Sequence, residues 1–248
     1  MLINPRKKIY DKLCILYEET TFDIFIRSLK MNYIFFTTLS IILYVFAKFN
    51  SNDNSYVNSL ITFMIVTYFG WWVHYFVHEN DFEKIYAENT SDIMLFIKNN
   101  WLLNKIGLLI AFCSNFHDKI HHDSGINKRP FNWAFECIQN FIMEGGLILF
   151  LSKYLNFSVH IGHVFKLNNA VLLLWGLLYT SVHNINYIIL GCNQHEKHHI
   201  NPKTNYGIDT IDILFDTKYD KYNIENFNHA TINLVVITLV ILYYKIYL

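Results

Sequence analysis

The chain has 248 residues, of which 53% are hydrophobic and 16% charged, and its 20 Lys and Arg balance its 20 Asp and Glu. The zero net charge excludes the basic field of a nucleic-acid-binding protein, and the composition is too apolar for a disordered or an ordinary soluble chain. We therefore expect an integral membrane protein, in which 12 His are conspicuous because imidazole accumulates near lipid only where it binds something or moves protons.

Five apolar runs are candidate membrane spans, since a helix needs about 20 apolar residues to cross a bilayer. In chain order they are Tyr33 to Phe49, Leu60 to Val77, Ile138 to Leu155, Ala170 to Leu190 and Ile232 to Leu248. The first four predict two transmembrane hairpins, and the last, interrupted by Lys245, is compatible with a fifth span. Two further apolar stretches, Ile93 to Ile97 and Trp101 to Cys113, are broken by polar residues and are expected to lie in the membrane interface.

The distribution of Lys and Arg predicts how these spans are oriented. Six of them precede the first span and six lie between the second and third, whereas the loops within the hairpins hold only Lys48 and Lys166, with Lys153 at a helix end. The positive-inside rule therefore places the N-terminus and the polar segments in the cytosol. The expected protein is all-α, with a cytosolic N-terminal segment (1–32), a first transmembrane hairpin (33–78), cytosolic or interfacial helices (79–137), a second hairpin (138–190), a cytosolic cap (191–230) and a C-terminal apolar helix (231–248).

Eight of the histidines form three motifs, all on the predicted cytosolic side. They are His74 and His78 (HxxxH), His117, His121 and His122 (HxxxHH), and His195, His198 and His199 (HxxHH). Residues i and i+4 share one face of a helix, whereas adjacent residues diverge by about 100°, so each triplet can give ligands to two metals. Imidazole is the commonest metal ligand, and eight nitrogens are too many for one four-coordinate zinc. The sequence therefore predicts a dimetal site.

These motifs, followed by Asn205-Tyr206-Gly207 and by Asp212-Ile213-Leu214-Phe215-Asp216-Thr217, resemble the fatty acid hydroxylase/sterol desaturase superfamily of membrane di-iron oxygenases over roughly residues 60–220. The resemblance implies two Fe ions on the cytosolic side of the endoplasmic reticulum membrane. It also implies activation of O2 with electrons from NAD(P)H, delivered by a reductase and a b-type cytochrome. The expected reaction is hydroxylation or desaturation of a membrane lipid, with fatty acyl chains, sphingolipids and sterol precursors all open as substrates.

The resemblance implies two further site residues. His183 occupies the place of a ninth metal ligand, and Glu144 occupies that of a glutamate that supports a ligand by hydrogen bonding. The chain departs from the family where Tyr75 replaces the basic residue of the first histidine motif, and where Ile211 and Asp216 replace the Trp and Gly of the sequence W-D-x-x-F-G-T. These departures leave the expected ligands in place and concern the subfamily, and hence the substrate.

Two other functions fit part of the pattern. The run His195-Glu196-Lys197-His198-His199 also satisfies HExxH, which is typical of zinc proteases with the glutamate as general base, so an intramembrane zinc protease is one alternative. A histidine-rich metal transporter is the other, and it needs ionisable residues along a path through the bilayer. The remaining histidines, His160, His163 and His229, lie outside the three motifs and are not expected to be ligands.

Overall fold

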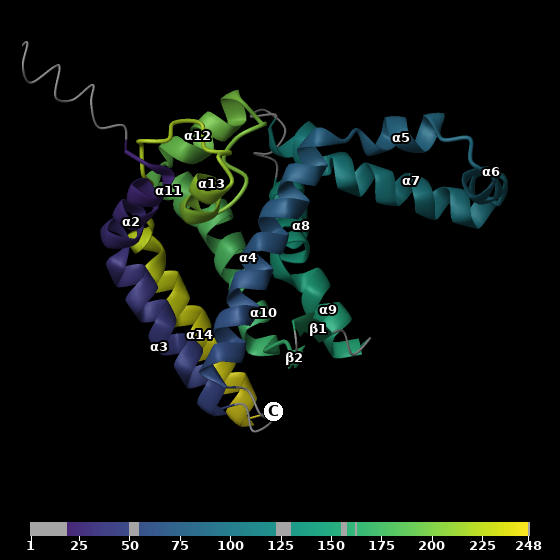
Figure 1. Ribbon diagram of the computed structural model, residues 1–248. Helices are drawn as coiled ribbons and strands as arrows, with labels where there is room; N and C mark the ends of the chain where they lie inside the picture. The colour runs from purple at the N-terminus through teal and green to yellow at the C-terminus, as the bar shows by residue number, and fades with distance from the viewer. Residues whose placement is uncertain (1–18, 50–54, 123–129, 155–157, 162, 248) are drawn as a thin grey trace, which may run out of the picture.

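The computed structural model describes residues 19–49, 55–122, 130–154, 158–161 and 163–247, so most of the predicted segment 1–32 lies outside the described residues. The chain forms a bundle of helices with one lateral arm (Figure 1). The α-helices are α2 (Thr21–Met31), α3 (Tyr33–Phe49), α4 (Tyr56–Glu79), α5 (Phe82–Glu88), α6 (Asp92–Asn99), α7 (Trp101–Phe116), α8 (Pro130–Phe141), α9 (Leu147–Tyr154), α10 (Asn169–Ser181), α11 (Tyr187–Leu190), α12 (Asn193–Ile200), α13 (Asp209–Leu214) and α14 (Thr231–Tyr247). Short π-helices η1 (His117–His121), η2 (Ile142–Gly146) and η3 (Val182–Asn186) and the 3₁₀-helix η4 (Phe227–Ala230) connect them.

One small hairpin departs from the predicted all-α architecture. The strands β1 (Ser158–Ile161) and β2 (His163–Lys166) pair antiparallel, with His160 opposite Val164. They lie at the end of the bundle opposite α12 (Figure 1). The strands therefore carry two of the histidines that are not expected to be ligands, far from the third histidine motif.

The described residues contain three helical segments that are long and apolar enough to cross a membrane, namely Tyr56–Glu79, Pro130–Tyr154 and Phe227–Lys245. The number rises to five if each of two bent pairs counts as one span. These pairs are α2 with α3, bent by 77°, and α6 with α7, bent by 109°. The structure is thus compatible with a membrane protein. The predicted span 33–49 meets the length and apolarity criterion only together with α2.

The predicted span 170–190 is helical but is not among those segments. His183 and Asn184 interrupt the apolar run where α10 passes through η3 into α11. This helix is the centre of the bundle, since it packs against α3, α4, α8 and α14 and the side chains of Val171 and Leu172 are fully buried. The polar residues of this segment are enclosed by protein and do not face lipid, so they do not have to be apolar.

A close approach of two glycines joins the central helix to its neighbour. A Cβ at Gly145 in η2 would lie 2.7 Å from the carbonyl oxygen of Leu172 and 3.0 Å from the backbone nitrogen of Gly176, so a side chain there would force the helices apart. Small residues let membrane helices pack at short distance, where dispersion contacts stabilise the pair. Both α10 and η3 also contact α8, next to the site described below.

The helices α5 to α7 form the arm, which projects sideways from the bundle (Figure 1). Its base is fixed by Asn115, whose Nδ2 donates to Asp81 Oδ1 (2.8 Å) and whose Oδ1 accepts from the backbone N–H of Phe82 (2.9 Å). Ile93 and Trp101 remain about three-quarters exposed on the arm. The interfacial location of these segments stays a prediction, because α6 and α7 taken together also meet the criterion for one bent span.

Candidate metal centre

Four separate segments bring the predicted ligands to one end of the bundle. His74 and His78 lie on the last turns of α4, and the second motif begins in η1. His183 lies in η3, and the third motif lies on α12. Single π-helical turns of this kind recur at functional sites because they re-aim side chains within a helix.

A first group of ligand atoms comes from His74, His78, His117 and His198, and these atoms all lie within 4.8 Å of one another. His74 Nε2 and His117 Nε2 are 2.9 Å apart. The four rings come from α4, η1 and α12, which are far apart in the sequence. This set is called group 1 below.

A second group lies beside it. Ligand atoms of His121, His183 and His195 lie within 4.8 Å of one another, and His121 Nε2 is 3.1 Å from His183 Nε2. His199 joins them, because its Nε2 lies 3.0 Å from His195 Nε2. These four residues are called group 2 below.

His122 lies between the groups, with its ring centroid 4.8 Å from that of His198 and 4.5 Å from that of His199. The structure therefore brings all nine predicted ligands together. The adjacent residues His198 and His199 belong to different groups, and so do His117 and His121 of the second motif. Each triplet therefore contributes histidines to both groups. For His198 and His199 the reason is the divergence of neighbouring side chains on a helix.

The nitrogen geometry fits metal ions. Two imidazole nitrogens that are each about 2.1 Å from one metal, at an angle of about 90 to 109°, lie roughly 3.0 to 3.4 Å apart, close to the distances within both groups. Both ring nitrogens of His122, His117 Nδ1 and His198 Nε2 are buried without a hydrogen-bond partner in the described part of the chain. Leaving such a group unsatisfied costs about 1–3 kcal/mol, so bound metals would relieve a cost that the fold otherwise carries.

The imidazoles of α12 are uncharged at neutral pH. Burial, together with the neighbouring imidazoles, lowers the pKa of His198 to about 3 and that of His199 to about 4. Burial also holds the pKa of His195 well below its ordinary value. Neutral imidazole is the form that binds metal, so the site is ready to accept cations without first losing protons.

Two backbone carbonyls orient group 1. His74 Nδ1 lies 2.7 Å from the carbonyl oxygen of Tyr206, and His198 Nδ1 lies 2.6 Å from that of Thr204. A histidine that donates its Nδ1–H to a carbonyl presents Nε2 to the metal, with the ring held in one orientation. The Asn-Tyr-Gly sequence therefore sits where it can position ligands.

Asp212 holds that carbonyl segment in place. Its carboxylate accepts the backbone N–H groups of Tyr206 and Gly207, both at 3.0 Å, and the hydroxyl of Thr217 at 2.7 Å. Burial raises the pKa of Asp212 to about 6, and these three hydrogen bonds oppose the rise. Asp212 and Thr217 of the Asp-x-x-Phe-x-Thr motif thus hold in place the segment whose carbonyl orients His74. These hydrogen bonds are called the clamp below.

The left-handed backbone conformation explains why Asn and Asp occur at two positions of this loop. Asn205 and Asp216 both have φ of +55°, a region that glycine tolerates best and that Asn and Asp adopt more readily than other residues. Asp216 stands where the resemblance described in the sequence implies a glycine, and this aspartate takes the left-handed turn. The departure therefore leaves the clamp intact.

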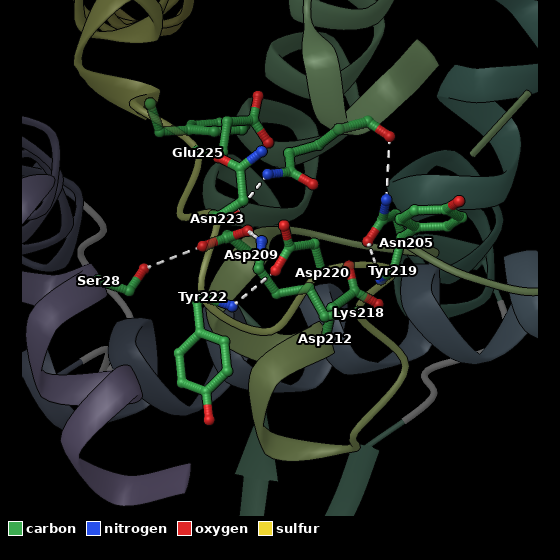
Figure 2. A network of polar contacts seen from close by, with 12 residues as sticks. Ser28, Asn205, Asp209, Asp212, Lys218, Tyr219, Asp220, Tyr222, Asn223 and Glu225 are labelled. Carbon is green, nitrogen blue, oxygen red and sulfur yellow. Dashed lines mark hydrogen bonds and ion pairs between the residues drawn. The ribbon is translucent and has the colours of Figure 1, made fainter. Parts of the chain in front are cut away.

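Polar contacts within the same loop extend to α2 through Ser28 (Figure 2). Lys218 and Asp209 form a buried ion pair, and Ser28 Oγ on α2 donates to Asp209 Oδ2 at 3.4 Å. Asn205 Oδ1 accepts the backbone N–H of Tyr219 at 3.0 Å. These contacts fix the loop over the end of the bundle that carries α12.

Glu136, which sequence reasoning missed, is the carboxylate beside the histidines. Its Oε1 lies 2.9 Å from His121 Nδ1 and accepts a hydrogen bond from Asn184 Nδ2 at 2.9 Å. Glu144, the residue suggested for this role, instead accepts from Trp175 Nε1 at 3.1 Å. The two glutamates are eight positions apart along α8 and η2, and no local signal distinguishes them, because the choice depends on where η1 packs.

We predict that Glu136→Gln lowers the affinity of group 2 for metal by about 10-fold and Glu136→Ala by up to about 100-fold, the usual range for a residue that orients a ligand. The measurement is metal content after dialysis against chelators of increasing strength. Glu144→Gln is the matched control and should retain its metal. Equal loss from the two Gln variants would contradict the role of Glu136.

A cavity of about 410 Å³ opens onto group 2 and not onto group 1. The four histidines of group 2 and Glu136 line it together with Pro130, Trp133, Tyr187 and Ile188. The side chain of Ile188 is 69% exposed, so the lining includes an apolar surface that is accessible from outside. A mostly apolar hollow with a few polar groups at one side suits a ligand with a long hydrocarbon part.

No protein family, curated protein or solved structure matches the chain in comparisons with known proteins.

Proposed function

We propose that the chain is an O2-dependent lipid hydroxylase or desaturase of the fatty acid hydroxylase/sterol desaturase superfamily, with two Fe ions held by the nine histidines. The observation that carries the proposal is the pair of adjacent histidine groups, of which one faces an apolar cavity. When bound, the two metals would supply the oxidant that an unactivated C–H bond requires, with O2 and external electrons. Nine imidazole nitrogen donors and one nearby carboxylate are suited to iron.

The residues around group 2 would prepare the substrate and the ligands. Asn140 Nδ2 donates to Asn184 Oδ1, and Asn184 donates to Glu136, so a buried chain of hydrogen bonds fixes the carboxylate beside His121. Trp133 Nε1 donates to the carbonyl oxygen of Asn184 at 3.2 Å, which holds the indole at the cavity wall. In the proposal, Trp133 and Ile188 bind the hydrocarbon chain and exclude water, while the histidines hold the reactive metals.

The proposed location follows from the positions of the site and of the apolar segments. A site at the end of a bundle of candidate spans can take a lipid from the membrane and electrons from a reductase and a b-type cytochrome in the cytosol. We propose the endoplasmic reticulum as this membrane, with the histidines on the cytosolic side. The charge distribution in the sequence supports this orientation.

The alternatives account for fewer of these observations. A zinc protease would need Glu196 to face a metal-bound water, but Glu196 is exposed, while His195 and His199 lie against the rings of His121 and His183. A transporter would need ligands distributed across the bilayer, whereas the nine histidines gather at one end. Neither alternative explains why two groups of histidines lie side by side.

The test is metal content combined with turnover. We expect the purified protein, reconstituted with iron, to contain about two Fe per chain and to yield an oxidised lipid only when both O2 and a reductant are supplied. Mass spectrometry of lipids from cells that produce the protein would identify the substrate. A preparation with about one zinc, no iron and no O2-dependent lipid product would contradict the proposal.

A further inference from the structure

The C-terminal helix α14 contributes no histidine to either group, yet one of its polar residues contacts the segment that carries a ligand. Asn233 is the only amide side chain of α14, in a run that is otherwise mostly apolar. A polar side chain in an apolar helix of a candidate span is costly where it faces lipid, so it is expected to face protein and to make a specific contact there. The contacts of Asn233 are with the residues on either side of His183.

His183 lies in the π-turn η3, which interrupts the helix formed by α10 and α11. The backbone N–H of Tyr187 donates to the carbonyl oxygen of Val182, five residues earlier, so this turn contains one residue more than an α-helical turn. One extra residue rotates everything that follows it by about 100° relative to the preceding helix. A π-turn is a rare conformation, so contacts from other elements must favour this one.

Asn233 bridges the two ends of that turn. Its Nδ2 donates to Ser181 Oγ, immediately before η3, at 3.0 Å, and to Oδ1 of Asn186, the last residue of η3, at 3.1 Å. In return, Asn186 Nδ2 donates to Asn233 Oδ1 at 3.0 Å, and its second N–H can donate to His229 Nδ1, also 3.0 Å away. All four N–H groups of the two amides therefore have an acceptor, which gives the network one preferred geometry.

A second set of contacts holds η3 to α8 but does not join its ends. Asn184 Nδ2 donates to Glu136, and the carbonyl oxygen of Asn184 accepts from Trp133 Nε1. The ring of His183 is stacked on that of Tyr179, with the centroids 5.4 Å apart. These contacts fix the middle of the turn, whereas the bridge from α14 sets the separation of its two ends.

We propose that Asn233, together with Asn186, is a positioning residue of the metal centre. By joining the two ends of η3 it keeps the π-turn and so directs the imidazole of His183 into group 2. Without the bridge, η3 relaxes towards an α-helical turn, and His183 moves relative to the residues that follow it. The inference rests on the two-metal centre proposed above. It also gives a role to His229, which lies outside both groups.

The test uses the full chain loaded with Co²⁺, whose visible absorption spectrum reports the ligands around each ion. Asn233→Ala should lower the affinity of one of the two bound Co²⁺ ions about 10-fold in chelator competition, at the lower end of the range for residues that orient a ligand. The spectrum should change, and the other ion should bind as in the wild type. Ser181→Ala, which removes one end of the bridge and keeps the Asn186–Asn233 pair, should cause a smaller loss of the same ion.

Thr238→Val is the matched control for a general disturbance of α14. Thr238 is buried on the same helix, but its hydroxyl donates to the carbonyl oxygen of Leu234, within that helix. The substitution therefore removes a buried hydrogen bond of α14 and leaves the bridge to η3 in place. Its affinity for Co²⁺ and its Co²⁺ spectrum should equal those of the wild type, even if it unfolds as easily as Asn233→Ala.

His183→Ala shows whether Asn233 acts through His183. The double variant Asn233→Ala/His183→Ala should bind Co²⁺ no more weakly than His183→Ala alone, because the ligand that Asn233 positions is already absent. A further loss of similar size in the double variant, unchanged Co²⁺ binding by Asn233→Ala, or an equal loss in Thr238→Val would each overturn the proposal. A wild-type chain that binds fewer than two Co²⁺ ions would contradict the two-metal centre itself, and this inference with it.

Discussion

His121→Ala is expected to remove one of the two metals and to reduce lipid oxidation at least about 100-fold. His121 Nε2 lies 3.1 Å from His183 Nε2, and its Nδ1 lies beside Glu136, so this ring connects group 2 to its supporting carboxylate. Its loss removes a direct ligand, which should cost more than the loss of an orienting residue. Metal analysis of the purified variant and product formation in the presence of O2 measure the two effects.

Two companion variants make this result specific. His74→Ala should also remove about one metal, but from group 1, because His74 contacts His117 and not the group 2 ligands. His163→Ala should leave metal content and activity unchanged, since His163 belongs to β2 at the other end of the bundle. Equal losses from His121→Ala and His163→Ala would contradict the assignment of the site.

Asp212→Ala is expected to destabilise the fold and to weaken metal binding in group 1. The substitution leaves the N–H groups of Tyr206 and Gly207 and the hydroxyl of Thr217 without their acceptor. Unsatisfied buried groups cost about 1–3 kcal/mol each, so the free energy of unfolding should fall by at least about 3 kcal/mol. Because Tyr206 would no longer hold His74, the affinity of group 1 for metal should fall about 10- to 100-fold.

Denaturant unfolding of the metal-free protein measures the first effect, and chelator competition measures the second. Asp216→Gly is the matched control, because it removes another carboxylate of the same loop at a position where φ is +55°. Glycine adopts this conformation at little cost, so the control should be as stable as the wild type or slightly more stable. A stable Asp212→Ala variant with a full complement of metal would show that the clamp is unnecessary.

The sequence by itself determined most of the candidate metal ligands, because the spacing that identifies them is local. A spacing of four residues on a helix places two imidazoles on one face, and a histidine doublet sends its members apart. The nine predicted ligands are accordingly the nine that meet in the structure, and the three other histidines, on β1, β2 and η4, lie outside both groups. The Asn-Tyr-Gly and Asp-x-x-Phe-x-Thr sequences also pointed to the site, although their role as a clamp needed coordinates.

The sequence was less informative about the bundle. Apolar runs identified most of the helices, but α10, η3 and α11 show why apolarity is an incomplete guide. That segment is not among the candidate spans, yet its first part, α10, occupies the centre of the bundle. Enclosure by neighbouring helices removes the need for an apolar surface, and a single sequence does not reveal which helix is enclosed.

Only the tertiary structure decided which carboxylate supports the ligands, how the histidines divide between two groups, and where the cavity opens. Glu136 and Glu144 lie on one continuous helical segment, and the contact that separates their roles is the packing of η1 and η3 against it. The cavity likewise forms between elements that are distant in the chain. Local spacing specifies which side chains share a face, whereas the meeting of distant faces depends on the packing of the whole bundle.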